Sequence, residues 1–384
     1  MLLGSLWNFV RSMGRTSIEV YEWQEADVRQ RRLQSPPNFA KLTTRQQDLT
    51  FSGWSLAHAV VKADYLDRRN LAMPGFGFLL QAEGLIELGR SPLQLRAGAS
   101  KALNDVSLTG LSARVGQGLA ILYGHSLGLA FAAHLRSHVQ GLPAGSQGVE
   151  HQDDAMADFL FANKHKTVVI ESKGSFTLKN NDPTAIKSVL KRALTKQVDP
   201  WMGYLQPAPS NGFVVYSCLR EASWAPSALF VVDPEGQGGD PPQLPFGQDQ
   251  VLRENYAGWL RAMGLPDAAA RLVRSTFGQE DGFPAEVSFH ITKIGGREYA
   301  FRGDYVDWPR QCCRPWIPAI GIDLAVLRAI SNTINAPNVD FEKSLQDLTV
   351  QTTIERQGYA SIFPDGSLFG PIAGTLDSLE RIRL

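Results

Sequence analysis

Three charged side chains lie at the ends of an apolar hairpin that the sequence predicts between residues 158 and 174. The stretch "DFLFANKHKTVVIESKG" has Asp158 before its first apolar run and Glu171 and Lys173 at the end of its second. If the turn centres on Lys164 and His165, facing residues have numbers that sum to 329, and Asp158 lies opposite Glu171. Their Cβ atoms are then about 4.5–5.5 Å apart, and Lys173 shares their face because side chains alternate along a strand.

Two carboxylates placed in this way repel each other unless a cation lies between them. Hard carboxylate oxygens suit Mg²⁺ or Mn²⁺, and a lysine beside them can bind a phosphate or help to position a water. Charged strand ends that simply meet solvent are the alternative, and an E-x-K triplet arises by chance about once in a chain of this length. However, "TVVIE" is apolar on both faces, which is typical of a buried central strand. These residues therefore predict a metal site that hydrolyses phosphodiesters.

The same stretch resembles the PD-(D/E)xK nuclease superfamily, which has a restriction-endonuclease-like fold. The family pattern is an acid on one strand, a hairpin, and an apolar strand that ends in E-x-K; Asp158, Glu171 and Lys173 match it. Gln197 matches a glutamine that the family often carries in the next helix. The resemblance implies that Asp158, Glu171 and the main-chain carbonyl of Ser172 hold Mg²⁺ or Mn²⁺, and that Lys173 orients the attacking water.

This resemblance covers roughly residues 110 to 235 and departs from the family at two positions. Ala157 replaces the usual proline before the first acid, and Gln117 stands where many members carry a helical glutamate. The sequence is therefore compatible with a site for either one or two metal ions. The resemblance implies an endonuclease that acts on nucleic acid, with DNA favoured over RNA. It also suggests a role in restriction or phage defence, with a homodimer or a protein of a defence system as partner.

A local excess of basic residues follows the hairpin, although the whole chain carries 38 basic and 38 acidic residues. Net neutrality provides no global field for nucleic acid, so a polyanion site must be local. Residues 161–200 hold eight basic and three acidic residues, a net charge of +5. The helical stretch "PTAIKSVLKRALTKQV" places Lys187 with Lys191, and Arg192 with Lys196, at a spacing of four. We expect these four to bind the phosphate backbone; a solvated helix face is the alternative for each.

A serine motif supports a competing function. Residues 124–128, "GHSLG", match the G-x-S-x-G nucleophile elbow of α/β-hydrolases, with Ser126 as nucleophile, Asp233 as acid and His290 as base. Against this hypothesis, His290 lies in the strand-like "VSFHI", and too few strands precede Ser126. In the nuclease interpretation the same residues finish a helix and begin the first strand of the core, with Gly128 at the junction. A catalytically weak nucleic-acid-binding module on the same scaffold is a second alternative.

The elements that position these residues predict a mixed α/β protein in three regions. Residues 1–105 are expected to be mostly helical, and "WSLAHAVVKADYLDRR" suits an amphipathic helix. Residues 106–236 predict the order α-β-β-β-α-β-β, a mixed central sheet flanked by helices. Residues 237–384 predict an α+β accessory region, with helices at "QVLRENYAGWLRAMG" and "GIDLAVLRAISNTI" and a hairpin that turns at Gly295-Gly296.

Composition and patterning narrow the class of protein further. Three cysteines without CxxC spacing indicate neither a disulfide framework nor a zinc site, so we expect a cytoplasmic protein. Residues 115–135 contain no Asp, Glu, Lys or Arg, but their two histidines and four glycines favour a buried element over a membrane span. Asp153 and Asp154 fall outside the paired register, and His151 and His165 are expected in a loop and a turn.

Overall fold

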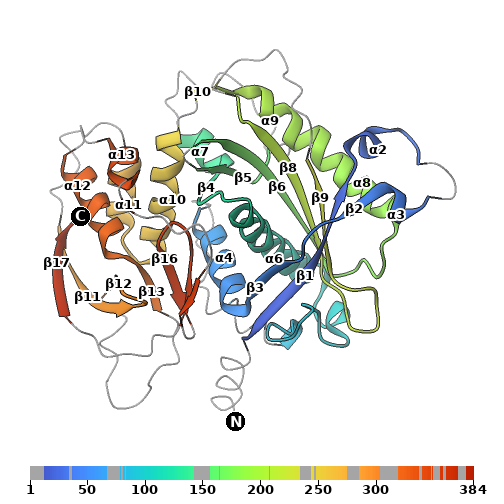
Figure 1. Cartoon of the computed structure of the whole chain (residues 1–384), viewed down its shortest axis with the longest axis horizontal. Helices are drawn as coiled ribbons and strands as arrows, with labels where there is room; N and C mark the ends of the chain where they lie inside the picture. The colour runs from blue at the N-terminus through green and yellow to red at the C-terminus, as the bar shows by residue number, and fades with distance from the viewer. Residues whose placement is uncertain are drawn as a thin grey trace, which may run out of the picture.

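A central sheet of eight strands organises the first part of the chain in this computed structural model (Figure 1). The strand order is β2-β1-β9-β8-β6-β5-β4, and β3 pairs with β1. The strands are β1 (Arg15–Trp23), β2 (Thr43–Arg45), β3 (Leu49–Ser52), β4 (Phe131–His134), β5 (Phe159–Ala162), β6 (Thr167–Ser175), β8 (Asn211–Cys218) and β9 (Ala228–Val232). A separate short pair consists of β7 (Leu205–Gln206) and β10 (Leu244–Pro245).

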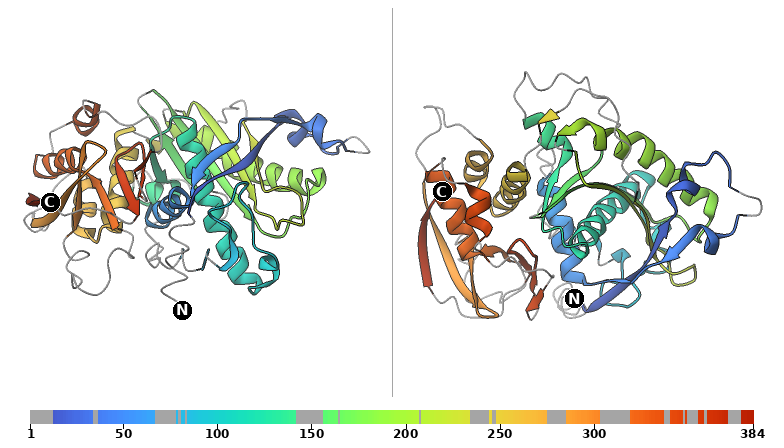
Figure 2. Two further views of the ribbon diagram at one scale, coloured as in Figure 1. Left: turned by 60° about the horizontal axis from the view of Figure 1, so that its bottom comes forward. Right: turned by 45° about the horizontal axis from the view of Figure 1, so that its top comes forward.

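Helices pack on both faces of this sheet (Figure 2). They are α2 (Glu25–Arg29), α3 (Phe39–Leu42), α4 (Gly53–Leu66), the 3₁₀ turn η1 (Ala99–Lys101), α6 (Asp105–Ser126), α7 (Leu135–Gly141), α8 (Pro183–Ala193), the π-helical turn η4 (Leu194–Val198) and α9 (Asp199–Tyr204). The structure describes residues 13–33, 37–66, 78, 81–82, 84–141, 156–163, 165–206, 208–233, 244–245, 248–274, 285–302, 319–336, 340–346, 348, 355–357, 360–370 and 378–384.

The predicted mixed central sheet with flanking helices is confirmed for the middle of the chain. The predicted elements α6, β4, β5, β6, α8, β8 and β9 follow one another in the expected order, but α7 lies between β4 and β5, and η4, α9 and β7 lie between α8 and β8. The pairs β4–β5, β5–β6 and β8–β9 are antiparallel, whereas β6–β8 is parallel, so the sheet is mixed. Every residue from Val168 to Ser172 is buried, as the two-sided apolar pattern of this strand predicted.

The N-terminal region contributes strands to the central sheet as well as helices. Strand β1 pairs in parallel with β9, which places it next to the last strand of the predicted core. Strands β2 and β3 then pair antiparallel with β1. Strands β1, β2 and β3 therefore extend the central sheet beyond β9.

A second sheet of seven strands forms the C-terminal part, in the order β14-β15-β16-β13-β12-β11-β17. Its strands are β11 (Glu286–Ile294), β12 (Arg297–Arg302), β13 (Ala319–Asp323), β14 (Glu355–Gln357), β15 (Ala360–Ile362), β16 (Ser367–Gly370) and β17 (Ser378–Arg383). Its helices are α10 (Gln248–Ala262), α11 (Pro266–Val273), α12 (Leu324–Asn335) and α13 (Phe341–Gln346). The predicted turn between β11 and β12 is confirmed, with φ of 58° at Gly295 and 86° at Gly296. The "GID" that begins one predicted helix belongs instead to β13.

Helix α4 connects the two parts and has no solvent-facing side. The sequence suggested an amphipathic helix, but every residue of α4 except Tyr65 is buried. The reason is that α4 packs against α6 on the central side and against α10, β15 and β16 on the C-terminal side (Figure 1). Its polar Lys62 and Asp64 are therefore enclosed along with its apolar side chains.

The uncharged stretch 115–135 forms most of α6 and all of β4, which agrees with the expectation of a buried element. None of the helices in the described ranges combines the length and the apolarity needed to cross a membrane. His151, Asp153, Asp154 and Lys164 lie outside the described residues.

Candidate metal and nucleic-acid site

The predicted hairpin register is confirmed. Phe159 pairs with Ile170, and the three further pairs of β5 and β6 keep the same sum of residue numbers. Asp158 directly precedes β5, and its backbone N–H donates to Oε2 of Glu171 at 3.0 Å. The two acids are therefore neighbours across the open end of the hairpin.

Glu171 is a carboxylate buried inside the sheet. It has no exposed surface, and burial raises its pKa well above the ordinary value, with the nearby Asp158 acting in the same direction. The ammonium group of Lys173 opposes this shift because it forms an ion pair and a hydrogen bond with Oε1 of Glu171. The Lys173 side chain is 36% exposed, so it connects the buried acid with solvent.

Asp158 is held by the strand that carries Glu171. Its Oδ2 accepts a hydrogen bond from the backbone N–H of Ser172 at 3.0 Å and another from the Ser172 hydroxyl. Only the main-chain carbonyl of Ser172 was predicted to belong to the site, and this side-chain contact was not predicted. The one feature of the sequence that could have indicated this contact is the serine between Glu171 and Lys173.

Side-chain alternation places Glu171 and Lys173 on the face of the sheet that η4 covers. A Cβ on Gly212, which pairs with Val169, would overlap the Val198 side chain of η4. Residues 169, 171 and 173 share that face because side chains alternate with a period of two. Gln197 belongs to the same turn, and its Nε2 donates to the carbonyl of Met156 at 3.1 Å, two residues before Asp158.

Helix α6 lies against the opposite face and approaches β6 very closely. A Cβ on Gly174 would overlap the carbonyl oxygen of Ser112, and a Cβ on Gly116 would lie 2.9 Å from the carbonyl oxygen of Lys173. The glycine after E-x-K is thus needed for backbone-to-backbone packing. Gln117 lies on this helix, across the sheet from η4.

The four predicted phosphate-binding residues have different environments. Lys187 is 7% exposed, and its Nζ is buried without a hydrogen-bond partner; burial, and then Lys191, lower its pKa. Lys191 Nζ donates to the backbone carbonyls of Arg29 at 2.8 Å and Gln30 at 3.2 Å. Arg192 and Lys196 are exposed. This structure therefore presents only the second of the two predicted pairs to solvent.

Ser126 lies in a different local structure from a nucleophile elbow. It is the last residue of α6, and its hydroxyl donates to the carbonyl of Tyr123 at 2.6 Å. Gly128, with φ of 76°, then leads into β4. An elbow requires a strand followed by a helix, and here the order is reversed. His290 lies on β11 of the second sheet.

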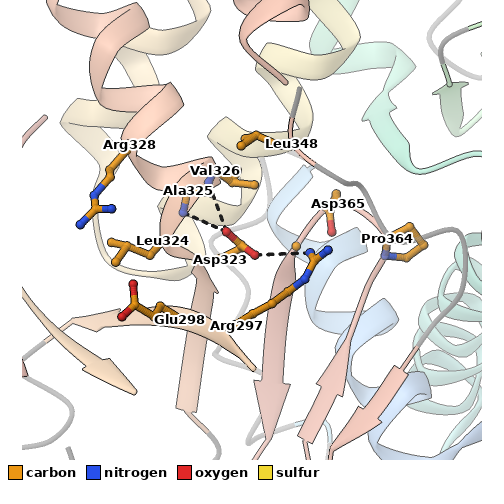
Figure 3. Close-up of a pocket in the computed structure, with 11 residues that line it drawn as sticks. Arg297, Glu298, Asp323, Leu324, Ala325, Val326, Arg328, Leu348, Pro364 and Asp365 are labelled. Carbon is orange, nitrogen blue, oxygen red and sulfur yellow. Dashed lines mark hydrogen bonds and ion pairs between the residues drawn. The ribbon is translucent and has the colours of Figure 1, made fainter. Parts of the chain in front are cut away.

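The structure also contains a cavity of about 270 Å³ in the C-terminal part (Figure 3). Its polar groups pair with each other or with neighbours. Asp323 caps α12 by accepting from Ala325 N–H at 2.9 Å and pairs with Arg297 at 3.5 Å. Arg328 pairs with Glu380 at 2.8 Å. Asp323 and Arg328 thus have structural roles, as a helix cap and in an ion pair between α12 and β17.

Across the described ranges, no group of three or more His, Cys, Asp and Glu side chains is arranged to hold a metal ion. The hairpin site accordingly offers two carboxylates from side chains. The chain matches no family model, no curated protein and no solved structure.

Proposed function

We propose that this chain is a metal-dependent nuclease of the PD-(D/E)xK type that hydrolyses phosphodiester bonds of DNA or RNA. The observation that carries the proposal is the hydrogen bond from the Asp158 backbone N–H to the buried Glu171 carboxylate on β6, with Lys173 bonded to the same carboxylate. The mixed central sheet with helices on both faces supports it, since the resemblance implies a sheet of this kind. A role in restriction or phage defence is part of the same proposal.

The residues at the site fit a hard divalent cation. Burial and Asp158 raise the pKa of Glu171, and Lys173 opposes this shift only in part. A bound cation would therefore stabilise the ionised carboxylate further. Oxygen ligands from carboxylates are those that Mg²⁺ and Mn²⁺ prefer. Asp158, Glu171 and the Ser172 carbonyl would hold the ion, which when bound supplies positive charge and a lowered pKa for water.

Lys173 and Gln197 would serve this site in different ways. Lys173 is a catalytic candidate because its ammonium reaches both Glu171 and solvent, where it can orient a water and stabilise phosphate charge. Gln197 is a positioning residue, since its amide holds the chain at Met156, just before Asp158.

A second candidate function is nucleic-acid binding without cleavage. The observation that favours it is the internal pairing of the site, in which Ser172 binds Asp158 and Lys173 binds Glu171. If Asp158 and Glu171 keep these partners and hold no metal ion, the chain cannot cleave by this mechanism. Its basic residues can still bind a phosphate backbone.

Cleavage assays separate these functions. We expect the purified chain to cleave DNA or RNA with Mg²⁺ or Mn²⁺ and not with EDTA. Lys173→Ala should lower the rate at least 100-fold, within the range of about 10²–10⁴ for a proton-transfer or charge-stabilising group, without a change in the circular dichroism spectrum.

Lys343→Ala is the matched control, because Lys343 is exposed on α13 of the C-terminal part. It should cleave at the wild-type rate. A folded wild-type chain that shifts DNA or RNA in a gel but leaves it intact with either metal would replace the nuclease with the binding module.

A further inference from the structure

Trp224 differs from the other tryptophans that the structure describes. Trp23, Trp54, Trp201 and Trp259 are all at most 2% exposed, as expected for large apolar side chains in a core. Trp224 is partly exposed and lies in the loop between β8 and β9. Part of the Trp224 indole therefore faces solvent, where an aromatic ring can contact another molecule.

Lys179 is the polar neighbour of this indole. Its Nζ lies 5.2 Å from the centroid of the Trp224 ring, and its carbonyl accepts from the Ala225 N–H at 3.1 Å. Lys179 is itself exposed, in the loop between β6 and α8. An aromatic ring and a cation are therefore presented together on two adjacent loops.

Both loops lie at the same end of the central sheet, the end at which β6 finishes after Glu171 and Lys173. Strands β6 and β8 are parallel, so the loops that follow them leave the same edge of the sheet. The loop after β6 begins beyond Ser175, two residues from Lys173 on the same face. Lys179 follows Ser175 by four residues, so the loop that carries it continues directly from the strand of Glu171 and Lys173.

One buried arginine holds both loops. Arg220 has no exposed surface, and its Nε and Nη2 donate to the carbonyls of Leu178 at 2.8 Å and Asn180 at 3.0 Å. Its Nη1 donates to Oδ1 of Asn181 at 2.8 Å and to the carbonyl of Pro226 at 2.6 Å. All four acceptors are neutral amide oxygens. Arg220 thus fixes the two loops that present Lys179 and Trp224.

We propose that the Lys179–Trp224 surface binds a nucleotide of the substrate strand next to the scissile bond, with an unstacked base on the indole and a phosphate at Lys179. The proposal rests on the proposed function for the choice of nucleic acid as partner. The chemistry is that of single-strand binding, in which bases stack on aromatic rings and cations follow the backbone. The net charge of +5 over residues 161–200 agrees with such a partner.

Binding measured in EDTA tests this proposal apart from cleavage. The probe is a fluorescent single-stranded oligonucleotide, with its duplex for comparison, titrated with wild type, Trp224→Ala, Trp224→Phe, Lys179→Ala and the Lys343→Ala control. Removal of a stacking ring should weaken single-strand binding about 5- to 150-fold, whereas Trp224→Phe should retain most of it. Lys179→Ala should lower the slope of log affinity against log salt by about one, and Lys343→Ala should leave both quantities unchanged.

Tryptophan fluorescence provides a second readout that a loss of folding would not imitate. Trp224 is the one partly exposed indole among those described, so single-stranded DNA should quench wild-type emission, and Trp224→Phe should lose that quenching while it retains its melting temperature. Equal affinities of wild type and Trp224→Ala for the oligonucleotide, or a wild type that binds none, would overturn the proposal. If Trp224→Ala weakens binding but the wild type never cleaves with metal, the surface stands and the nuclease assignment falls. If the wild type cleaves and Trp224→Ala binds normally, only the surface falls.

Discussion

At the scale of single residues, Glu171 combines burial with charge in a way that makes its protonation state matter. Burial and the neighbouring Asp158 raise its pKa, and the Lys173 ammonium limits the shift. The folded chain therefore binds this proton more tightly than the unfolded chain. Its contribution to stability is present at low pH and is lost as the pH rises through the folded pKa. A bound cation would reverse that loss, because it favours the ionised form.

Glu171→Gln should remove this pH dependence. In EDTA, the stability of the variant relative to wild type is expected to increase from acidic to mildly alkaline pH, because glutamine cannot ionise inside the sheet. Added Mg²⁺ should raise the melting temperature of wild type and not that of the variant. Denaturant titrations at several pH values measure the first effect, and Glu298→Gln, at an exposed position on β12, is the control. A stability difference that is constant with pH would show that Glu171 is not the titrating group.

At the scale of elements, the close packing of α6 on β6 explains the glycine that follows the E-x-K triplet. The two backbones approach so closely at Gly116 and Gly174 that neither position leaves room for a side chain. This packing fixes the strand end that carries Glu171 and Lys173. It also explains why α6, with its long uncharged stretch, is buried rather than exposed to lipid.

Gly174→Ala should be strongly destabilising, because the new methyl group would overlap the carbonyl oxygen of Ser112. We expect a cost of about 1–3 kcal/mol or more in the free energy of unfolding. Gly110→Ala is the control, since Gly110 lies on α6 near Ser112 and its Cβ would meet nothing within 4 Å. That variant should gain up to about 1 kcal/mol from helix propensity. Urea denaturation measures both, and equal effects of the two variants would contradict the packing argument.

At the scale of the whole molecule, a buried polar network joins the two sheets through α4. Lys62 on α4 pairs with Asp365, which lies between β15 and β16, at 2.6 Å, and neither side chain is more than 1% exposed. Asn255 on α10 also donates to Asp365, at 2.8 Å. Although burial alone would raise the pKa of Asp365, the Lys62 ammonium holds it below its ordinary value. The central and C-terminal parts are therefore expected to unfold together.

Lys62→Met should cost about 3–5 kcal/mol, because it leaves the Asp365 carboxylate buried without its cation. Lys62→Met combined with Asp365→Asn should recover part of that cost. Arg328→Met is the control, since its ion pair with Glu380 is exposed and is worth at most about 1 kcal/mol. Unfolding followed by far-UV and near-UV circular dichroism should give coincident transitions in wild type. Separate transitions would show that the two parts fold independently.

The sequence by itself determined the hairpin register, the neighbouring positions of Asp158 and Glu171, and the mixed central sheet with flanking helices, although not α7, α9 and β7. These features depend on side-chain alternation and on pairing between strands that are close in the chain. Both can be read from the local pattern of apolar and charged residues.

Only the tertiary structure decided which segments meet across long distances. It placed β1 beside β9, enclosed α4 on all sides, and turned Lys187 and Lys191 toward other parts of the chain while Arg192 and Lys196 stayed exposed. It also brought Lys179 and Trp224 together above Arg220. The physical reason is that a helix or strand with suitable periodicity can pack against many partners. The choice depends on the free energy of the whole fold, to which distant residues contribute.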